Sequence, residues 1–123
     1  MNTKITPLAA GSLRDATIEL GQAFQQETGI NVEEFFGPSG KLRREIEAGC
    51  SMDVFACASI EHIDVLLSRK LLAESVVFAH NDLCVVSRSE AGLNEDNLLD
   101  VIKKPTLRLA TSTPVFDPMG DYT

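Results

Sequence analysis

Residues 30–49 have the sequence INVEEFFGPSGKLRREIEAG, and this stretch decides the fold. Apolar side chains recur through residues 30–36 and predict a strand. Ser39 then begins a helix in which Leu42 and Ile46 share one face, charged residues fill the other face, and a glycine ends the helix. The stretch is therefore a strand that is followed directly by a helix.

The same order occurs before and after this stretch. Residues 5–10 predict a strand that ends at a glycine, and Ser12 begins the next helix. Residues 53–58 are apolar after the first residue, which is typical of a central parallel strand, and Ser59 begins a third helix. Three strand–helix units in succession predict an α/β fold with a doubly wound, mainly parallel sheet.

The first helix carries apolar side chains at helical spacing. Because such side chains lie on one face of a helix, we expect that face to cover the core. Ser12 is placed to cap this helix, and Asp15 three residues later makes a variant of the capping box. The side chains expected to face the core are Leu13, Ala16, Leu20, Ala23 and Phe24.

The order of elements changes near Asn81, where two strand-like runs follow each other without a helix between them. We interpret this point as a crossing between two lobes. Residues 1–80 are then the N-terminal part of lobe one, and residues 81–123 are the crossover and the first part of an incomplete lobe two. The elements expected here are strands over residues 76–79, 83–86 and 107–110 and a short helix over residues 97–103.

The composition is that of an ordinary folded protein. Hydrophobic residues make up 44% of the 123 residues, and charged residues make up 24%. The net charge of −7 argues against a nucleic-acid partner, which needs a basic surface. It leaves a small anion possible, because surface charge is screened beyond about 8–10 Å. No apolar run approaches the roughly 18 residues that a membrane span needs.

The cysteines and histidines form no catalytic or metal-binding pattern. Cys50, Cys57 and Cys84 are expected to be free thiols, with Cys57 and Cys84 as small core residues. His62 and His80 have no nucleophile pattern around them, and we expect both at or near the surface. The sequence therefore predicts a protein that is not an enzyme and that uses no metal and no cofactor.

Small residues and a serine stand at each strand-to-helix turn, at Gly11–Ser12, Gly37–Gly40 and Ala58–Ser59. In open α/β sheets, ligands bind beyond the carboxyl ends of the strands. A helix N-terminus at that place offers unpaired N–H groups and the positive end of the helix dipole, so it attracts an anion. Each serine taken singly is more simply a helix cap, but the two roles are compatible.

The segment Gly37–Lys41 has a superficial similarity to a phosphate-binding P-loop. That motif needs four residues between its glycines and a hydroxyl residue after its lysine. Here two residues separate the glycines and Leu42 follows Lys41, so nucleotide binding is not expected.

Four segments, taken in order, carry a resemblance to one known family. Residues 8–13 (LAAGSL) resemble the turn after that family's first strand, and residues 53–58 (DVFACA) resemble its third strand. Residues 36–49 resemble its serine-rich second turn and the helix that ends in Ile-Glu-Ala-Gly, and residues 117–122 (DPMGDY) resemble a Pro-x-Gly-x-Tyr turn of its second lobe. The family is that of the molybdate/tungstate-binding proteins of ABC importers, and the chain is similar to its N-terminal half.

The resemblance implies a two-lobed, type II periplasmic binding protein that closes on its ligand like a hinge and serves an ABC permease. It implies that Ser12 and Ser39 donate hydroxyl and backbone hydrogen bonds to a tetrahedral oxyanion, molybdate or tungstate. Ala58 and, from the second lobe, Met119 would add backbone N–H groups. It also implies a periplasmic location, although Met1–Lys4 leads into the first strand without a signal peptide. Selection against sulfate would come mainly from the size of the cavity.

The chain departs from the family in length, because it ends at Thr123, just after the first turn of the second lobe. The later ligands of the family, a tyrosine hydroxyl and a further backbone donor, have no counterpart in it. We expect the strand edges that the missing part leaves open to favour a homodimer. Two alternatives stay open. One is the ligand-sensing domain of a regulator, which would need an attached DNA-binding segment, and the other is a receptor for another oxyanion such as sulfate.

Overall fold

The computed structural model describes residues 4–111, and these residues divide into two units. Unit one comprises residues 4–76, and unit two comprises residues 77–111. All the described strands and the three longest described helices belong to unit one. The predicted lobes, residues 1–80 and 81–123, stay a prediction.

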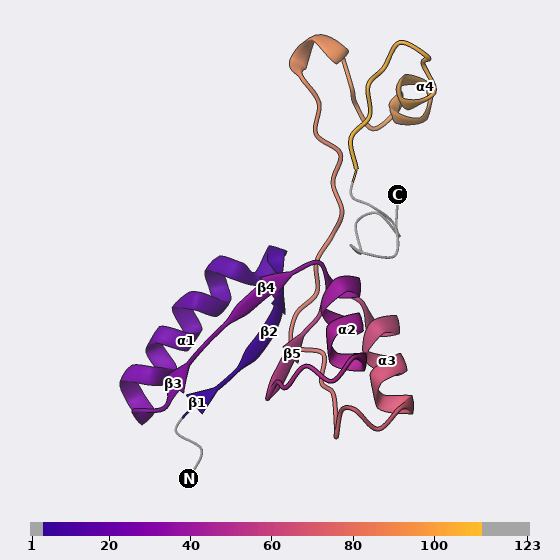
Figure 1. The fold of residues 1–123 in the computed structure, drawn as a ribbon. Coiled ribbons are helices and arrows are strands. Elements are labelled where there is room, and N and C mark those ends of the chain that lie inside the picture. The colour runs from indigo at the N-terminus through magenta and orange to yellow at the C-terminus, as the bar shows by residue number, and fades with distance from the viewer. Residues whose placement is uncertain (1–3, 112–123) are drawn as a thin grey trace. The chain divides into compact units, whose positions relative to one another are not determined.

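The strands of unit one form two small parallel sheets (Figure 1). β1 (Lys4–Ile5) pairs with β3 (Asn31–Val32), while β2 (Pro7–Ala10) lies between β4 (Phe35–Gly37) and β5 (Val54–Ala56). Every one of these pairs is parallel. The predicted α/β class with a mainly parallel sheet is therefore confirmed.

The register of the larger sheet brings the carboxyl ends of its strands together. Ala10 of β2 pairs with Gly37 of β4, and Ala9 pairs with Ala56 of β5. Neighbouring strands lie about 4.8 Å apart. The turns that follow β2, β4 and β5 consequently leave the sheet side by side, at what we call the strand-end edge.

The strand predicted over residues 5–10 is split at Thr6 into β1 and β2. The Thr6 N–H donates to Oδ2 of Asp53 at 2.8 Å, and the Thr6 carbonyl accepts the Asp53 N–H at 3.0 Å. These two bonds occupy the backbone of Thr6, so the chain passes from one sheet to the other at this residue.

Helices cover both sides of the strands of unit one. α1 (Arg14–Thr28) follows the short 3₁₀ helix η1 (Gly11–Leu13), and it contacts β3 and β2. α2 (Ser39–Glu47) and α3 (Ile60–Ser68) contact each other and lie on the other side (Figure 1). This arrangement is the doubly wound layout that the order of elements predicts. None of the described helices is long and apolar enough to cross a membrane.

The core of unit one includes side chains from the sheet and from α2 and α3. Leu8, Leu42, Ile46 and Leu66 are buried together. The prediction that Leu42 and Ile46 share the core-facing side of their helix is confirmed. Full burial of a side chain of this size stabilises the fold by about 1.5–3 kcal/mol.

The predicted core face of α1 is wrong. Leu20 is 69% exposed and Phe24 is also exposed, whereas Gly21 is buried. A Cβ atom added at Gly21 would lie 2.5 Å from Oε1 of Glu34 and 3.2 Å from Cγ1 of Val32. α1 therefore approaches the neighbouring strand segment closely at its glycine, and this contact sets the rotation of the helix.

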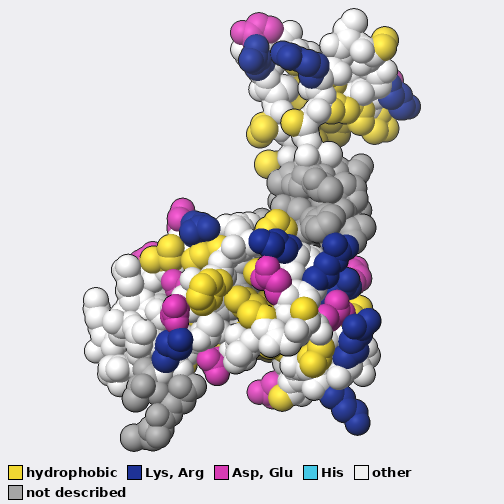
Figure 2. Space-filling view, viewed as in Figure 1, with side chains coloured by type: hydrophobic (Ala, Val, Ile, Leu, Met, Phe, Trp, Pro, Cys, Tyr) yellow, Lys and Arg dark blue, Asp and Glu magenta, His cyan; other side chains and the backbone are white. Residues whose placement is uncertain are grey.

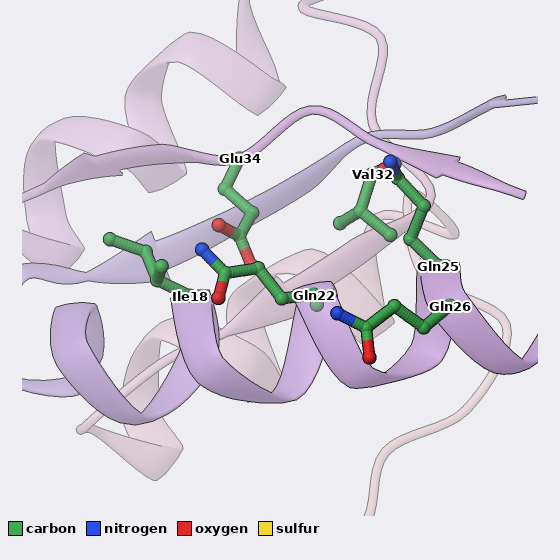
Figure 3. Close-up of a pocket in the computed structure, with 7 residues that line it drawn as sticks. Ile18, Gln22, Gln25, Gln26, Val32 and Glu34 are labelled. Atoms are coloured by element: carbon green, nitrogen blue, oxygen red, sulfur yellow. The ribbon is translucent and has the colours of Figure 1, made fainter.

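A groove of about 270 Å³ lies between α1 and the end of β3 with the segment that follows it (Figure 3). Oε1 of Glu34 is buried and has no hydrogen-bond partner within the described part of the chain. The carboxylate repels negative charge, so this groove does not suit an anion. The groove is lined by Ile18, Gly21, Gln22, Gln25, Gln26, Val32 and Glu34.

Unit two holds the 3₁₀ helix η2 (Ser89–Ala91) and the helix α4 (Leu98–Ile102). α4 confirms the short helix predicted in this region. Oδ1 of Asn94 accepts the N–H groups of Asp96 and Asn97 at 3.0 Å, which forms the turn that leads into α4.

The strands predicted over residues 76–79, 83–86 and 107–110 are absent from the structure. Val76 is 83% exposed and Val86 is 87% exposed. A strand is stable only when its backbone pairs with another strand, and these runs form no such pair among residues 4–111. Their apolar composition alone is therefore not enough to make strands.

The exposure of the cysteines and histidines differs in part from what the sequence predicts. Cys84 is exposed and Cys57 is only partly buried, although all three cysteines are free thiols as predicted. His62 is 6% exposed, so the expectation of a surface position is wrong for it, while His80 is exposed as predicted. His62 lies in α3 beside the buried Leu66, one helical turn away.

Candidate oxyanion site

The candidate site lies at the strand-end edge of unit one. Ser12, Ser39 and Ala58 are each the second residue after a strand, following β2, β4 and β5 respectively. Because the three strands are parallel and adjacent, the three residues emerge at the same edge of the sheet. This is where a doubly wound sheet binds its ligand.

Two of the three residues are in direct contact. The Ala58 N–H donates to Oγ of Ser39 at 3.4 Å, although the two residues are far apart in the sequence. The Ser39 side chain is almost completely buried, with 1% of the residue exposed, whereas Ala58 is exposed. The structure thus joins the turns after β4 and β5 at one point.

Ser12 and Met119 differ from this pair. Ser12 lies in η1 at the strand-end edge and is exposed, and among residues 4–111 it forms no hydrogen bond with Ser39 or Ala58. Met119 lies outside the described residues. The structure therefore joins Ser39 and Ala58 by a hydrogen bond, while Ser12 follows the central strand β2 and stays outside that contact.

None of the three turn serines caps a helix with its side chain. The N-cap residues of α1, α2 and α3 are Leu13, Pro38 and Ser59, and no side-chain cap bond forms at any of them. The predicted capping box of Ser12 is wrong because Ser12 falls inside the 3₁₀ turn. The hydroxyl of Ser59 donates instead to the carboxylate of Glu61. Side chains therefore leave the first amides of α1 and α2 without a cap.

The Cys57 thiol lies beside the Ser39–Ala58 contact. Its Sγ donates to the Ser59 carbonyl at 3.2 Å and accepts the Ser59 N–H at 3.4 Å. Burial raises the pKa of the Cys57 thiol, while hydrogen bonds from Ser59 and from the Ser39 side chain lower it in part. The thiol is accordingly neutral at neutral pH and adds no negative charge to the strand-end edge.

The arrangement supplies neutral hydrogen-bond donors. Oγ of Ser39 accepts from Ala58, so its own O–H is directed elsewhere, and the amide groups at the start of α2 add further N–H donors. Such a set can hold an anion without a compensating cation in the first contact layer. Among residues 4–111, no group of three His, Cys, Asp or Glu side chains is placed to hold a metal ion.

Sequence reasoning missed one charged contact at this edge. The guanidinium carbon of Arg14 lies 4.4 Å from the centroid of the Phe36 ring. Arg14 follows Ser12 by two residues, and Phe36 precedes Ser39 by three. Nothing in the spacing of the two residues indicates the contact, because it depends on how α1 lies against β4.

Comparison with known proteins identifies the family. The family model of the bacterial extracellular solute-binding proteins matches residues 5–123. An uncharacterized protein of Pasteurella multocida is 42% identical over 117 residues, which are 94% of this chain and 48% of that protein. The molybdate-binding protein ModA of Escherichia coli is 32% identical over 126 aligned residues, covering 97% of this chain and 49% of that protein.

A solved structure agrees in fold. It is the substrate binding domain assigned to a molybdenum ABC transporter of Clostridium difficile, with a TM-score of 0.53 and 26% sequence identity over 55% of this chain and 30% of that one. The chain spans about half the length of the two curated relatives named above. By the match over residues 5–123, the chain belongs to the family of bacterial extracellular solute-binding proteins.

Proposed function

We propose that the chain is part of the substrate-binding component of an ABC importer and that it binds molybdate or tungstate at the strand-end edge. The contact between the Ala58 N–H and Oγ of Ser39 carries this proposal, because it joins two strand-to-helix turns at one point. The molybdate-binding proteins among the relatives favour a tetrahedral oxyanion as the ligand. The role is binding without catalysis.

The proposed donors are the hydroxyl and backbone groups of Ser12 and Ser39 and the backbone N–H groups of Ala58 and Met119. The Ala58–Ser39 distance of 3.4 Å is at the long end of the range for hydrogen bonds. Both groups can exchange this contact at low cost for charge-assisted bonds of about 2.7–2.9 Å to an oxyanion. The resting contact thus holds the two donors near the place where the ligand binds.

The energies of the donors set the affinity that the proposed site can reach. A hydrogen bond to a charged ligand contributes about 1.5–3 kcal/mol, and a partly buried helix terminus contributes up to about 2 kcal/mol. A dissociation constant of about 1 μM corresponds to about 8 kcal/mol. Four or more donors that converge on one ion therefore reach this range only if little of their energy is lost in ordering the site.

The permease of the importer is the proposed protein partner, and the periplasm is the proposed location. The family name, which describes extracellular proteins, supports this location. The ligand needs neither a metal nor a cofactor, because neutral donors satisfy its oxygens. Selection of molybdate or tungstate over sulfate follows from cavity size, since all three are tetrahedral dianions.

Calorimetry and thermal shift with sodium molybdate, tungstate, sulfate and phosphate test the proposal. We expect molybdate and tungstate to raise the unfolding temperature and to release or absorb measurable heat, because a ligand that binds the native state stabilises it by mass action. Sulfate and phosphate should give smaller effects at equal concentration. Equal stabilisation by all four salts would contradict the proposed specificity. No stabilisation by any of them would contradict the proposed binding.

A further inference from the structure

We infer that Arg14, stacked on Phe36, provides the positive charge that draws the oxyanion to the strand-end edge. This inference rests on the proposed function, and it assigns a role to a residue outside the proposed set of donors. Arg14 would act from the rim of the site, through its field and before the donors close on the ligand.

The geometry fixes the guanidinium near the proposed donors. Its central carbon lies 4.4 Å from the Phe36 ring centroid, within the range of a cation–π contact. Phe36 lies in β4 directly before Gly37, which pairs with Ala10 at the carboxyl end of β2. Ser39 follows Phe36 by three positions in the chain, so their Cα atoms are at most about 11 Å apart.

Stacking leaves the charge available to a ligand. A guanidinium on a ring face keeps the N–H groups at its edge free, and it is more weakly hydrated than an ammonium group. Arg14 is exposed and takes part in none of the ion pairs formed among residues 4–111. Its field is therefore not cancelled by a neighbouring carboxylate in such a pair.

Other basic side chains of unit one are mostly paired. Basic side chains gather along α2 and α3 (Figure 2). The carboxylates of Glu45 and Glu47 offset three of them, through the pairs Lys41–Glu45, Arg43–Glu47 and Arg69–Glu47. In a chain of net charge −7, which repels a dianion at long range, an unpaired cation at the binding edge has a large relative effect.

Titration of sodium molybdate into the wild type and Arg14→Gln at several ionic strengths tests the inference. The matched control is Lys70→Gln, which removes the same charge. Lys70 lies just beyond the C-terminal end of α3, about 13 Å along the helix from the strand-end edge. Ionic strength is varied from about 0.01 M to about 0.15 M, over which the Debye length falls from about 30 Å to about 8 Å.

We expect Arg14→Gln to raise the dissociation constant about three- to ten-fold at the lowest ionic strength, with the difference shrinking as salt is added. Arg14→Lys should keep most of the affinity, and Lys70→Gln should change it less than Arg14→Gln does. A loss in Arg14→Gln that is equal at all ionic strengths would show a structural role and overturn the inference, as would equal behaviour of Arg14→Gln and Lys70→Gln. If the wild type itself fails to bind molybdate or tungstate, the proposed function falls, and the inference with it.

Discussion

Ser39 connects the two turns of the proposed site, because its hydroxyl oxygen accepts the Ala58 N–H while its side chain also hydrogen-bonds the Cys57 thiol. Ser39 is almost completely buried, so its hydroxyl is shielded from water. A buried donor of this kind contributes more to binding than an exposed one, since water does not compete for it.

Replacing Ser39 with alanine should weaken molybdate binding roughly 10- to 150-fold, the equivalent of one hydrogen bond of about 1.5–3 kcal/mol to a charged ligand. Calorimetric titration measures the change. Ser68→Ala is the matched control, because the Ser68 hydroxyl donates to the Val65 carbonyl near the end of α3, away from the strand-end edge. Affinity that is unchanged in Ser39→Ala would contradict the placement of the ligand.

The Cys57 thiol makes the free energy of unfolding fall at alkaline pH. Its pKa is raised in the folded chain, chiefly by burial, so the unfolded chain loses this proton at a lower pH than the folded chain does. The contribution of the thiol to the stability of the fold is therefore complete below the ordinary thiol pKa of about 8.5. It is lost as the pH rises through the pKa that the thiol has in the folded chain.

We expect the free energy of unfolding of the wild type to fall more steeply above about pH 8.5 than that of Cys57→Ala. Urea unfolding at a series of pH values measures both slopes. Cys50→Ala removes an exposed thiol and serves as the control. Parallel curves for the wild type and Cys57→Ala would show that the thiol is not shielded as the structure has it.

At the scale of the helices and strands, the sequence predicts the order of the elements but not the rotation of a helix about its own axis. The alternation of strands and helices follows from runs of apolar residues and from glycines and serines at the turns, and this order already places Ser12, Ser39 and Ala58 at one edge of a parallel sheet. The rotation of α1 depends on the close approach of Gly21 to Glu34, which no apolar spacing reveals.

The other differences between prediction and structure also depend on how the elements pack together. The Arg14–Phe36 contact joins a helix to a strand, so only the packed structure shows it. The runs over residues 76–79 and 83–86 are apolar enough for strands, but pairing decides whether a strand forms, and the sequence of one run does not name its partner.

Substitutions in α1 and α2 offer a direct test of the observed packing. Leu42→Ala in α2 should lower the free energy of unfolding by about 2–5 kcal/mol, because it opens a cavity in the core. Leu20→Ala in α1 should change it by less than about 0.5 kcal/mol, since that side chain is largely exposed. Urea unfolding of both variants measures the difference. A large loss in Leu20→Ala would restore the core face that the apolar spacing predicts.

At the scale of the whole molecule, β4 and β5 each have an unpaired edge within the part of the chain that the structure describes. Such edges carry free N–H and C=O groups that pair readily with another strand. The net charge of −7 opposes association, and salt weakens this repulsion.

We predict that the chain forms a homodimer and that the dimer is favoured by added salt. Sedimentation equilibrium at several salt concentrations measures the mass. Val54→Lys places a charge in the half-exposed edge strand β5 and should shift the equilibrium to the monomer. A mass of one chain at all protein and salt concentrations would exclude the dimer.

The burial of the Ser39 hydroxyl also has a spectroscopic consequence. A hydroxyl hydrogen in open water exchanges too fast to give its own proton resonance, whereas one enclosed by packed backbone is retained long enough to be seen. Ser39 therefore offers a natural NMR reporter inside the proposed site. Its signal should move downfield when a dianion replaces the Cys57 thiol as the hydrogen-bond partner of the Ser39 hydroxyl.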